Sequence, residues 1–332
     1  MSVSLTMWGI TVAAILVLVV LDFLTVSRKP HEVSFREAAL WSVFYIAVAV
    51  AFGVFVWVWQ GGDFGTQYFA AYLVEKSLSV DNLFVFVIIL AQFAVPSIYH
   101  QRVLLVGVVL ALVLRAIFIA VGAAALAAFS FTFVIFGAIL IWTGIQLFRH
   151  RNADPEPKDN LVVRTVRKWY PITPDYHDTK LFVRLDGRRM ATPLLLVMVA
   201  IASTDLLFAL DSIPATFGVT QEPYLVFTAN AAALLGLRAL YFLLKGLLDK
   251  LIYLSMGLAI ILVFIGLKLI LTFAHEVNTE IPKIPTVFSL VVIAVILIVV
   301  TVASLIKVRK DPSARAHAGT ITEPRHREDE QG

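Results

Sequence analysis

The sequence predicts an all-α, polytopic integral membrane protein with about nine transmembrane helices. Hydrophobic residues make up 60% of the chain, charged residues make up 15%, and the mean hydropathy is +0.88. A soluble globular domain carries about 25% charged residues, so the composition excludes that class. Stretches apolar enough to cross about 30 Å of hydrocarbon lie at 5–26, 38–59, 67–93, 103–127, 130–148, 192–217, 224–245, 251–274 and 286–306.

These spans group into six segments along the chain. Residues 1–66 hold two peripheral transmembrane helices, and the first is expected to be a retained helix because it carries Asp22 and lacks a basic region before it. A three-helix repeat follows at 67–148, and then a cytoplasmic loop at 149–191 with a predicted hairpin at Asp186-Gly187. The second repeat occupies 192–274, an outer loop with the last helix occupies 275–310, and the tail 311–332 is expected to be disordered.

The basic residues predict how the chain crosses the membrane. With the N-terminus outside, the inner segments hold twenty-two Lys and Arg residues, and the outer segments hold only Lys283. Cytoplasmic loops are enriched in basic residues, so this orientation is favoured over its reverse. We therefore expect a multi-pass protein of the cell membrane with a cytoplasmic C-terminus.

An internal repeat organises the middle of the chain. Leu114-Arg115-Ala in the fourth span matches Leu237-Arg238-Ala in the seventh, and Thr143-Gly144 in the fifth matches Ile265-Gly266 in the eighth. Each repeat holds three helices, and three is odd, so the second copy must cross the membrane in the opposite sense. Inverted-topology repeats are typical of secondary transporters, whose binding sites lie near the bilayer midplane between the halves.

Each repeat carries two carboxylates six residues apart in an otherwise apolar span. The first pair is Glu75 and Asp81, followed by Asn82, and the second is Asp205 and Asp211, followed by Ser212. A charge at this depth costs about 2.5 to 3.5 kcal/mol, and intramembrane ionisable residues mark functional sites by default. The duplicated spacing therefore predicts a site that binds a hard cation.

Helix geometry limits how these acids can act together. Two residues six positions apart on a straight helix are about 9 Å apart and rotated by roughly 240°. One possibility is that the helices open locally, which Pro214 and the hydroxyls of Ser79 and Ser212 would permit. The other is that one acid from each repeat forms the ion site, and the remaining acids form a second site or a proton relay.

The types of ligand narrow the choice of ion. Carboxylate, amide and hydroxyl oxygens suit Mn²⁺, Ca²⁺ or Mg²⁺, whereas Cu⁺ and Zn²⁺ prefer sulfur or imidazole. The chain has no cysteine, so thiolate sites, disulfides and thiol catalysis are excluded. Na⁺ and H⁺ stay open as bound or coupling ions. No organic cofactor and no nucleic-acid partner are expected, and an intramembrane protease is disfavoured because no catalytic accessory accompanies the acids.

Other charged residues in the spans have two interpretations. Arg115, Arg238 and Lys268 could support or gate the site, and Asp22 could pair with one of them. Structural ion pairs that merely neutralise the acids are the alternative. Lys268 stands where the first repeat has Gln146, so a tethered cation that occupies or gates the site is one possible role for it.

Three segments resemble the TerC family of integral membrane proteins. They are Glu75-Lys-Ser-Leu-Ser-Val-Asp81-Asn82, Asp205-Leu-Leu-Phe-Ala-Leu-Asp211-Ser212, and the loop phrase that runs from Lys180 to Pro193. The resemblance covers about residues 35–307.

The resemblance implies Mn²⁺ efflux, with Glu75, Asp81, Asn82, Asp205 and Asp211 as metal-site candidates. It also associates the chain with tellurium resistance, with supply of metal to exported enzymes and, through a plant relative, with thylakoid assembly. A membrane metal-delivery or stress-response assembly factor without transport of its own is therefore the alternative. Exported metalloenzymes or stress-response proteins would then be its partners. The absence of a nucleotide-binding motif favours exchange with protons as the source of energy.

Overall fold

The structure is a computed structural model that describes residues 3–27, 33–150, 163, 165, 168–169, 171–177, 180–185, 188–244, 251–282 and 284–311. For Asp81 it describes the backbone and not the side chain. The helices are α1 (Leu5–Ser27), α2 (Phe35–Gln60), α3 (Gly62–Gln92), α4 (Ser97–Ala128), α5 (Thr132–Arg149), α7 (Pro193–Val219), α8 (Pro223–Leu235), α9 (Leu237–Leu244), α10 (Leu254–Val277) and α11 (Thr286–Lys310). The strands are β1 (Phe182–Leu185) and β2 (Arg188–Ala191).

The described chain confirms the all-α membrane class. Eight of its helical segments are long and apolar enough to cross a bilayer, and α8 with α9 counts as one of them. Helix α3 is not among the eight, although its 31 residues exceed the length that a span needs. It carries Glu75, Lys76 and Asp81 in its interior, which is the feature that made this segment conspicuous in the sequence.

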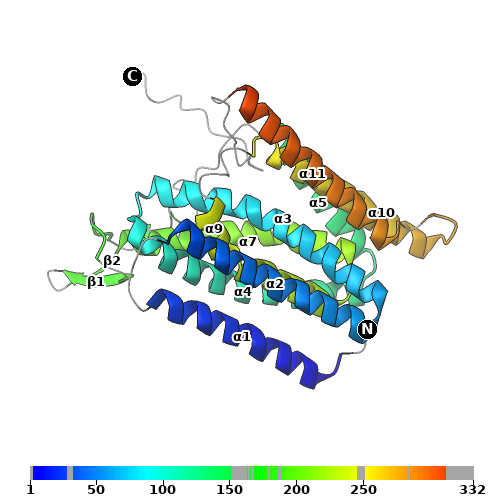
Figure 1. The fold of residues 1–332 in the computed structure, drawn as a ribbon, viewed down its shortest axis with the longest axis horizontal. Coiled ribbons are helices and arrows are strands. Elements are labelled where there is room, and N and C mark those ends of the chain that lie inside the picture. The colour runs from blue at the N-terminus through cyan, green and yellow to red at the C-terminus, as the bar shows by residue number, and fades with distance from the viewer. Residues whose placement is uncertain are drawn as a thin grey trace.

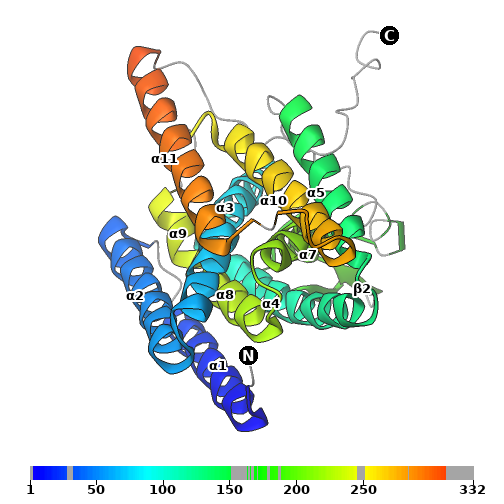
Figure 2. The same cartoon turned by 90° about the vertical axis from the view of Figure 1, so that its right-hand side faces the viewer.

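The helices run lengthwise in one bundle, and they differ greatly in how deeply they are buried. Figures 1 and 2 show α1, α2 and α11 on the outside and α3, α7 and α8 towards the middle. In the most apolar window of each candidate span, 83% of residues are buried for α8 with α9, but only 17% for α1 and 22% for α11. The acidic helices α3 and α7 therefore lie beside the most buried element.

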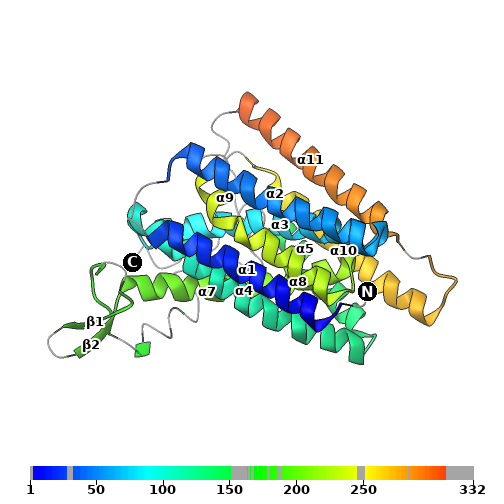
Figure 3. The same cartoon turned by 60° about the horizontal axis from the view of Figure 1, so that its bottom comes forward.

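A small β-hairpin extends from one end of the bundle, opposite the end at which α1 begins (Figures 1 and 3). Strands β1 and β2 pair antiparallel with Leu185 opposite Arg188, which confirms the predicted hairpin; Asp186 and Gly187 lie outside the described residues. The Tyr176 hydroxyl, which precedes the hairpin, donates to the carbonyl of Phe93 just after α3 at 2.7 Å. Burial raises the pKa of the Tyr176 phenol to about 12. The hairpin is thus tied to the helix that carries the first acidic pair.

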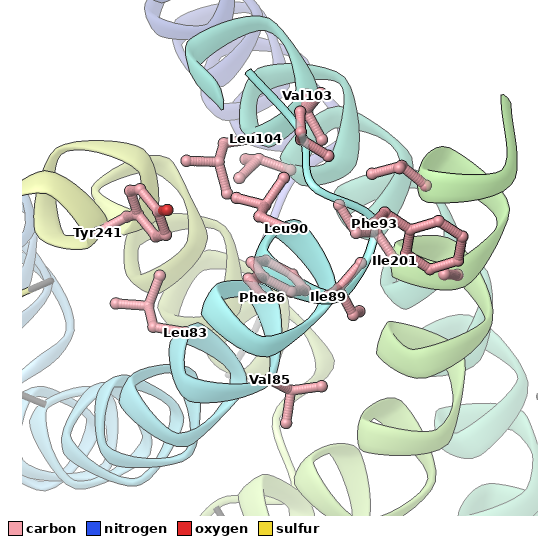
Figure 4. Packing of buried hydrophobic residues seen from close by; sticks show 14 of the residues in the cluster. Leu83, Val85, Phe86, Ile89, Leu90, Phe93, Val103, Leu104, Ile201 and Tyr241 are labelled. Carbon is pink, nitrogen blue, oxygen red and sulfur yellow. The ribbon is translucent and has the colours of Figure 1, made fainter. Parts of the chain in front are cut away.

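The end of the bundle near the hairpin holds a close-packed apolar cluster. Leu83, Phe86 and Leu90 lie on one face of α3 at helical spacing, and they meet Leu104 of α4 and Ile201 of α7 (Figure 4). Lipid tails are as apolar as these side chains, so van der Waals packing rather than exclusion of water holds such a cluster together. It fixes α3, α4 and α7 relative to one another near the acidic residues.

Helices α5 and α10 approach each other through glycines. A Cβ atom on Gly137 would lie 2.6 Å from the carbonyl oxygen of Gly266, and one on Gly144 would lie 2.8 Å from that of Ala259. Small residues allow this backbone approach. In the predicted repeats Gly144 is equivalent to Gly266, and Gly137 is then equivalent to Ala259. Under this equivalence the contact of Gly137 with Gly266 corresponds to the contact of Ala259 with Gly144. This correspondence supports a two-fold relation between α5 and α10, while the inverted repeat stays a prediction.

The seventh predicted span is interrupted rather than continuous. Helix α8 ends at Leu235, Gly236 turns its N–H back to the carbonyl of Leu234, and α9 begins at Leu237. The last four carbonyls of a helix lack partners within it, and Lys76 of α3 donates to one of them, that of Ala233, at 3.3 Å. The sequence placed one helix at 224–245 and did not show this break.

Some sequence predictions fall outside the described residues. These are most of the loop 149–191, Lys283 of the outer segments, and the tail 311–332 apart from Asp311. The orientation of the termini and the cell-membrane location also stay predictions.

Candidate functional site

Helix α3 presents one polar stripe to the centre of the bundle. Glu75, Ser79 and Asn82 are spaced by four and three residues, so they lie on one face of the helix, and all three are buried. Helix α3 continues from Gly62 to Gln92 without interruption. Local opening of the helix is therefore not what brings these groups to the interior.

Helix α7 presents the matching stripe. Asp205, Ser212 and Thr216 are spaced by seven and four residues and share a face in the same way, and all three are buried. Pro214 lies inside this helix, which nevertheless runs from Pro193 to Val219. The first of the two geometric possibilities, opened helices, is thus wrong for the described chain, and the acids meet across helices instead.

Arg115 of α4 joins the two stripes. Its Nη1 donates to Glu75 Oε2 at 2.8 Å, and its Nη2 donates to Asp205 Oδ1 at 3.4 Å. With the amide of Asn82 oriented to satisfy its neighbours, the same Nη2 also donates to the Asn82 oxygen at 3.0 Å. Arg115 has a relative exposure of 0%. One guanidinium therefore bridges one acid from each predicted repeat.

Several oxygens around this bridge differ in how they are satisfied. The hydroxyl of Thr216 donates to Glu75 Oε1 at 2.7 Å, so both oxygens of that carboxylate are bonded. By contrast, Asp205 Oδ2, Ser79 Oγ and Ser212 Oγ are buried without a hydrogen-bond partner among the described residues. An unsatisfied buried polar atom costs about 1 to 3 kcal/mol. Buried oxygens of this kind are the donor type that a hard cation uses.

The second acid of each pair lies off these stripes. Asp211 is half-buried on α7 and close enough to Arg115 and Glu75 to interact with both electrostatically. The backbone of Asp81 lies in α3, and its side chain lies outside what the structure describes. The arrangement of Glu75 and Asp205 matches the second geometric possibility, in which one acid from each repeat faces a shared site.

The other predicted supporting residues lie apart from this bridge. Arg238 of α9 donates from Nε to Asp22 Oδ2 at 3.0 Å and from Nη2 to Asp22 Oδ1 at 2.5 Å. Asp22 is on α1, so this pair joins an outer helix to the centre of the bundle. For Asp22 and Arg238 the structure thus shows the alternative given above, an ion pair in which each residue neutralises the other. Lys268 is buried on α10, and its gating role stays a prediction.

The candidate ligands are of the type that a hard cation prefers, but their described side chains do not form a preformed metal site. Among the side chains that the structure describes, no group of three or more His, Cys, Asp or Glu could hold a metal ion. The guanidinium of Arg115 stands between the two acids instead. Sequence reasoning missed this bridge and the role of Thr216, although Thr216 lies eleven positions after Asp205 and therefore on its face.

Comparisons with known proteins add a family. Residues 60–312 match the model of the integral membrane protein TerC family. The chain is 42% identical to an uncharacterized membrane protein, STKORF319, of Myxococcus xanthus, over 95% of this chain and 97% of that protein.

Two further relatives carry more specific names. The thylakoid membrane protein TERC, chloroplastic, of Arabidopsis thaliana is 40% identical over 76% of this chain and 65% of its own length. The "Putative membrane-bound redox modulator Alx" of Photorhabdus laumondii is 38% identical over 81% of this chain and 87% of its own length. No solved structure matches the chain.

Proposed function

The chain belongs to the integral membrane protein TerC family, and we propose that it is a secondary transporter. It exports a hard divalent cation, Mn²⁺ first among the candidates, from the cytoplasm in exchange for protons. The cation binds between α3 and α7, at Glu75 and Asp205, with Asp81, Asn82 and Asp211 as further ligands.

One observation carries the proposal. The buried carboxylates of Glu75 on α3 and Asp205 on α7 both contact the guanidinium of Arg115. The second oxygen of Asp205, Oδ2, has no hydrogen-bond partner among the described residues. Intramembrane acids that serve only structure should have their oxygens satisfied, because each unsatisfied one is costly. The hydroxyls of Ser79 and Ser212, likewise unpartnered there, add neutral oxygens on the same helix faces.

The chemistry of the donors supports Mn²⁺ over softer metals. Every candidate ligand is an oxygen, the chain lacks cysteine, and no methionine is among the candidate ligands, whereas Cu⁺ prefers sulfur. The same lack bears on the redox name of one relative: this chain has no thiol with which to exchange electrons or disulfides. The proposal accounts for an influence on redox state by the supply of a metal to other proteins.

Proton exchange follows from the ligands. A carboxylate must lose its proton before it binds a metal ion, so metal entry releases protons and metal release permits their return. Alternating exposure of a site between two helix groups then couples the two flows. If the flux of Mn²⁺ does not change when a pH gradient is imposed, the proposed coupling to protons is wrong.

The test is uptake of Mn²⁺ into inside-out proteoliposomes. We expect saturable uptake by the wild type, and a loss of at least about tenfold in Asp205→Asn and Glu75→Gln. Asp63→Asn is the matched control, because Asp63 is an exposed acid in the first turn of the same helix α3. Folding is checked by size-exclusion chromatography of each variant.

A well-folded wild type that moves neither Mn²⁺ nor Ca²⁺, with and without a pH gradient, would contradict transport. It would favour the metal-delivery or stress-response assembly role.

A further inference from the structure

We propose that Arg115 is a resident counter-cation: its guanidinium takes the place of the transported ion when the site is empty and must leave before a divalent cation binds. This inference rests on the proposed function, because it describes how that same site is emptied and refilled. It assigns to Arg115 a role in exchange rather than in holding the fold together.

The position of Arg115 is the first argument. Its two terminal nitrogens reach Glu75 of α3 at 2.8 Å and Asp205 of α7 at 3.4 Å, so the positive charge lies between the acids. A divalent cation bound by the same oxygens would need this space. Two cations this close in a region of low dielectric repel strongly, and the site therefore holds one or the other.

The fit of Arg115 is the second argument, and the chain supplies its own comparison. Arg238 grips the single carboxylate of Asp22 through two nitrogens and both carboxylate oxygens, which is the geometry of a fixed bidentate pair. Arg115 instead gives single bonds to separate residues, and its bond to Asp205 is longer than the usual 2.7 to 2.9 Å of a charge-assisted bond. Its Nε is buried without a hydrogen-bond partner among the described residues.

The oxygens that Arg115 leaves unsatisfied are the third argument. Asp205 Oδ2, Ser79 Oγ and Ser212 Oγ have no described hydrogen-bond partner, although they share helix faces with groups that do. A guanidinium has a planar set of donors, whereas a spherical cation can draw in ligands from all sides. The site is therefore satisfied incompletely by Arg115, and a metal ion would satisfy it better.

A consequence for the transport cycle follows. With Arg115 in place, the metal-free site does not leave Glu75 and Asp205 as two bare carboxylates in the membrane interior, so the metal-free site can reopen to the other side of the membrane. In the proposed exchange, the returning protons then occupy the further ligands Asp81 and Asp211. Without the charge of Arg115 the site would bind the metal ion more tightly. The metal-free site could then not readily reopen to the other side of the membrane, because its carboxylates would lie unpaired in the membrane interior. Such a variant can still exchange one Mn²⁺ for another, because the site is then occupied in both directions of the cycle.

The experiment measures net efflux and exchange separately in proteoliposomes loaded with radioactive Mn²⁺, at pH 8 on both sides. Net efflux is measured into metal-free buffer, exchange is measured against external Mn²⁺, and binding is measured on the purified full-length protein. For Arg115→Gln we expect binding about 5- to 150-fold tighter, the usual range for coupled sites, with exchange retained and net efflux lost. Arg309→Gln makes the same change at an exposed position on α11 and should match the wild type.

The outcomes separate the two proposals. Unchanged or weaker binding in Arg115→Gln, or a wild-type ratio of net efflux to exchange, overturns the counter-cation role while transport stands. A wild type that binds and moves no Mn²⁺ overturns the proposed function and this inference together. If Arg115→Gln does not fold, Arg115→Lys is tested in its place, because the ammonium of lysine keeps the positive charge but lacks the planar set of donors of the guanidinium. Intermediate affinity and a lowered ratio are then expected, and wild-type values of both overturn the inference.

Discussion

The ion pair between Asp22 and Arg238 should dominate the attachment of α1 to the bundle. Both side chains are 5% exposed, and the guanidinium contacts both carboxylate oxygens. Asp22→Asn leaves this buried guanidinium without its carboxylate, which costs about 3 to 5 kcal/mol of unfolding free energy. Replacing both charges, as in Asp22→Leu with Arg238→Met, leaves no uncompensated charge and should be nearly neutral or stabilising. Equilibrium unfolding in mixed SDS micelles, followed by tryptophan fluorescence, measures the double variant and the single variants Asp22→Asn, Asp22→Leu and Arg238→Met.

A second ion pair in the chain provides the control. Lys307 and Asp311 are 3.4 Å apart but 45% and 43% exposed, so Lys307→Ala should change the unfolding free energy by no more than about 1 kcal/mol. If the Asp22 and Arg238 single variants cost as little as this control, or if the double variant costs the sum of the two, the pair does not act as a buried unit. The reasoning from burial would then be refuted.

Two further predictions concern the packing of helices and the hairpin. Gly266→Ala should destabilise the protein by about 1 to 3 kcal/mol, because the added methyl would lie 2.7 Å from the carbonyl oxygen of Gly137. Gly9→Ala meets nothing within 4 Å, and it should not destabilise the protein in the same unfolding assay. The raised pKa of Tyr176 predicts that its stabilising contribution is complete below about pH 10 and is lost as the pH rises through about 12. Amide exchange in β1 and β2 should report this loss, and Tyr176→Phe should abolish the pH dependence; an unchanged alkaline profile in Tyr176→Phe would contradict it.

The sequence predicted the membrane class, the positions of most helices and the hairpin because these depend on local patterns. Apolar length determines a span, and Asp186-Gly187 between alternating residues determines a hairpin. The same reasoning limited the acids correctly: six residues on a straight helix point in different directions. It therefore allowed one acid from each predicted repeat to come together, and in the structure Glu75 and Asp205 both contact the guanidinium of Arg115.

The features that the sequence did not reveal depend on contacts between distant segments. Arg115 lies 40 positions from Glu75 and 90 from Asp205, and nothing local distinguishes it from Arg238, which pairs with α1 instead. Glycine is tolerated within helices, so Gly236 did not by itself indicate the end of α8. The donation from Lys76 to the carbonyl of Ala233 shows what compensates this break, and it required the packing of α3 against α8.

The most direct test of the account is to locate bound Mn²⁺ by anomalous diffraction from crystals of the wild type grown with Mn²⁺. The account predicts an anomalous peak about 2 to 2.6 Å from oxygens of both Glu75 and Asp205, with the guanidinium of Arg115 moved away from both. A peak elsewhere in the bundle, or no peak with Arg115 still bridging the two acids at saturating Mn²⁺, would contradict it.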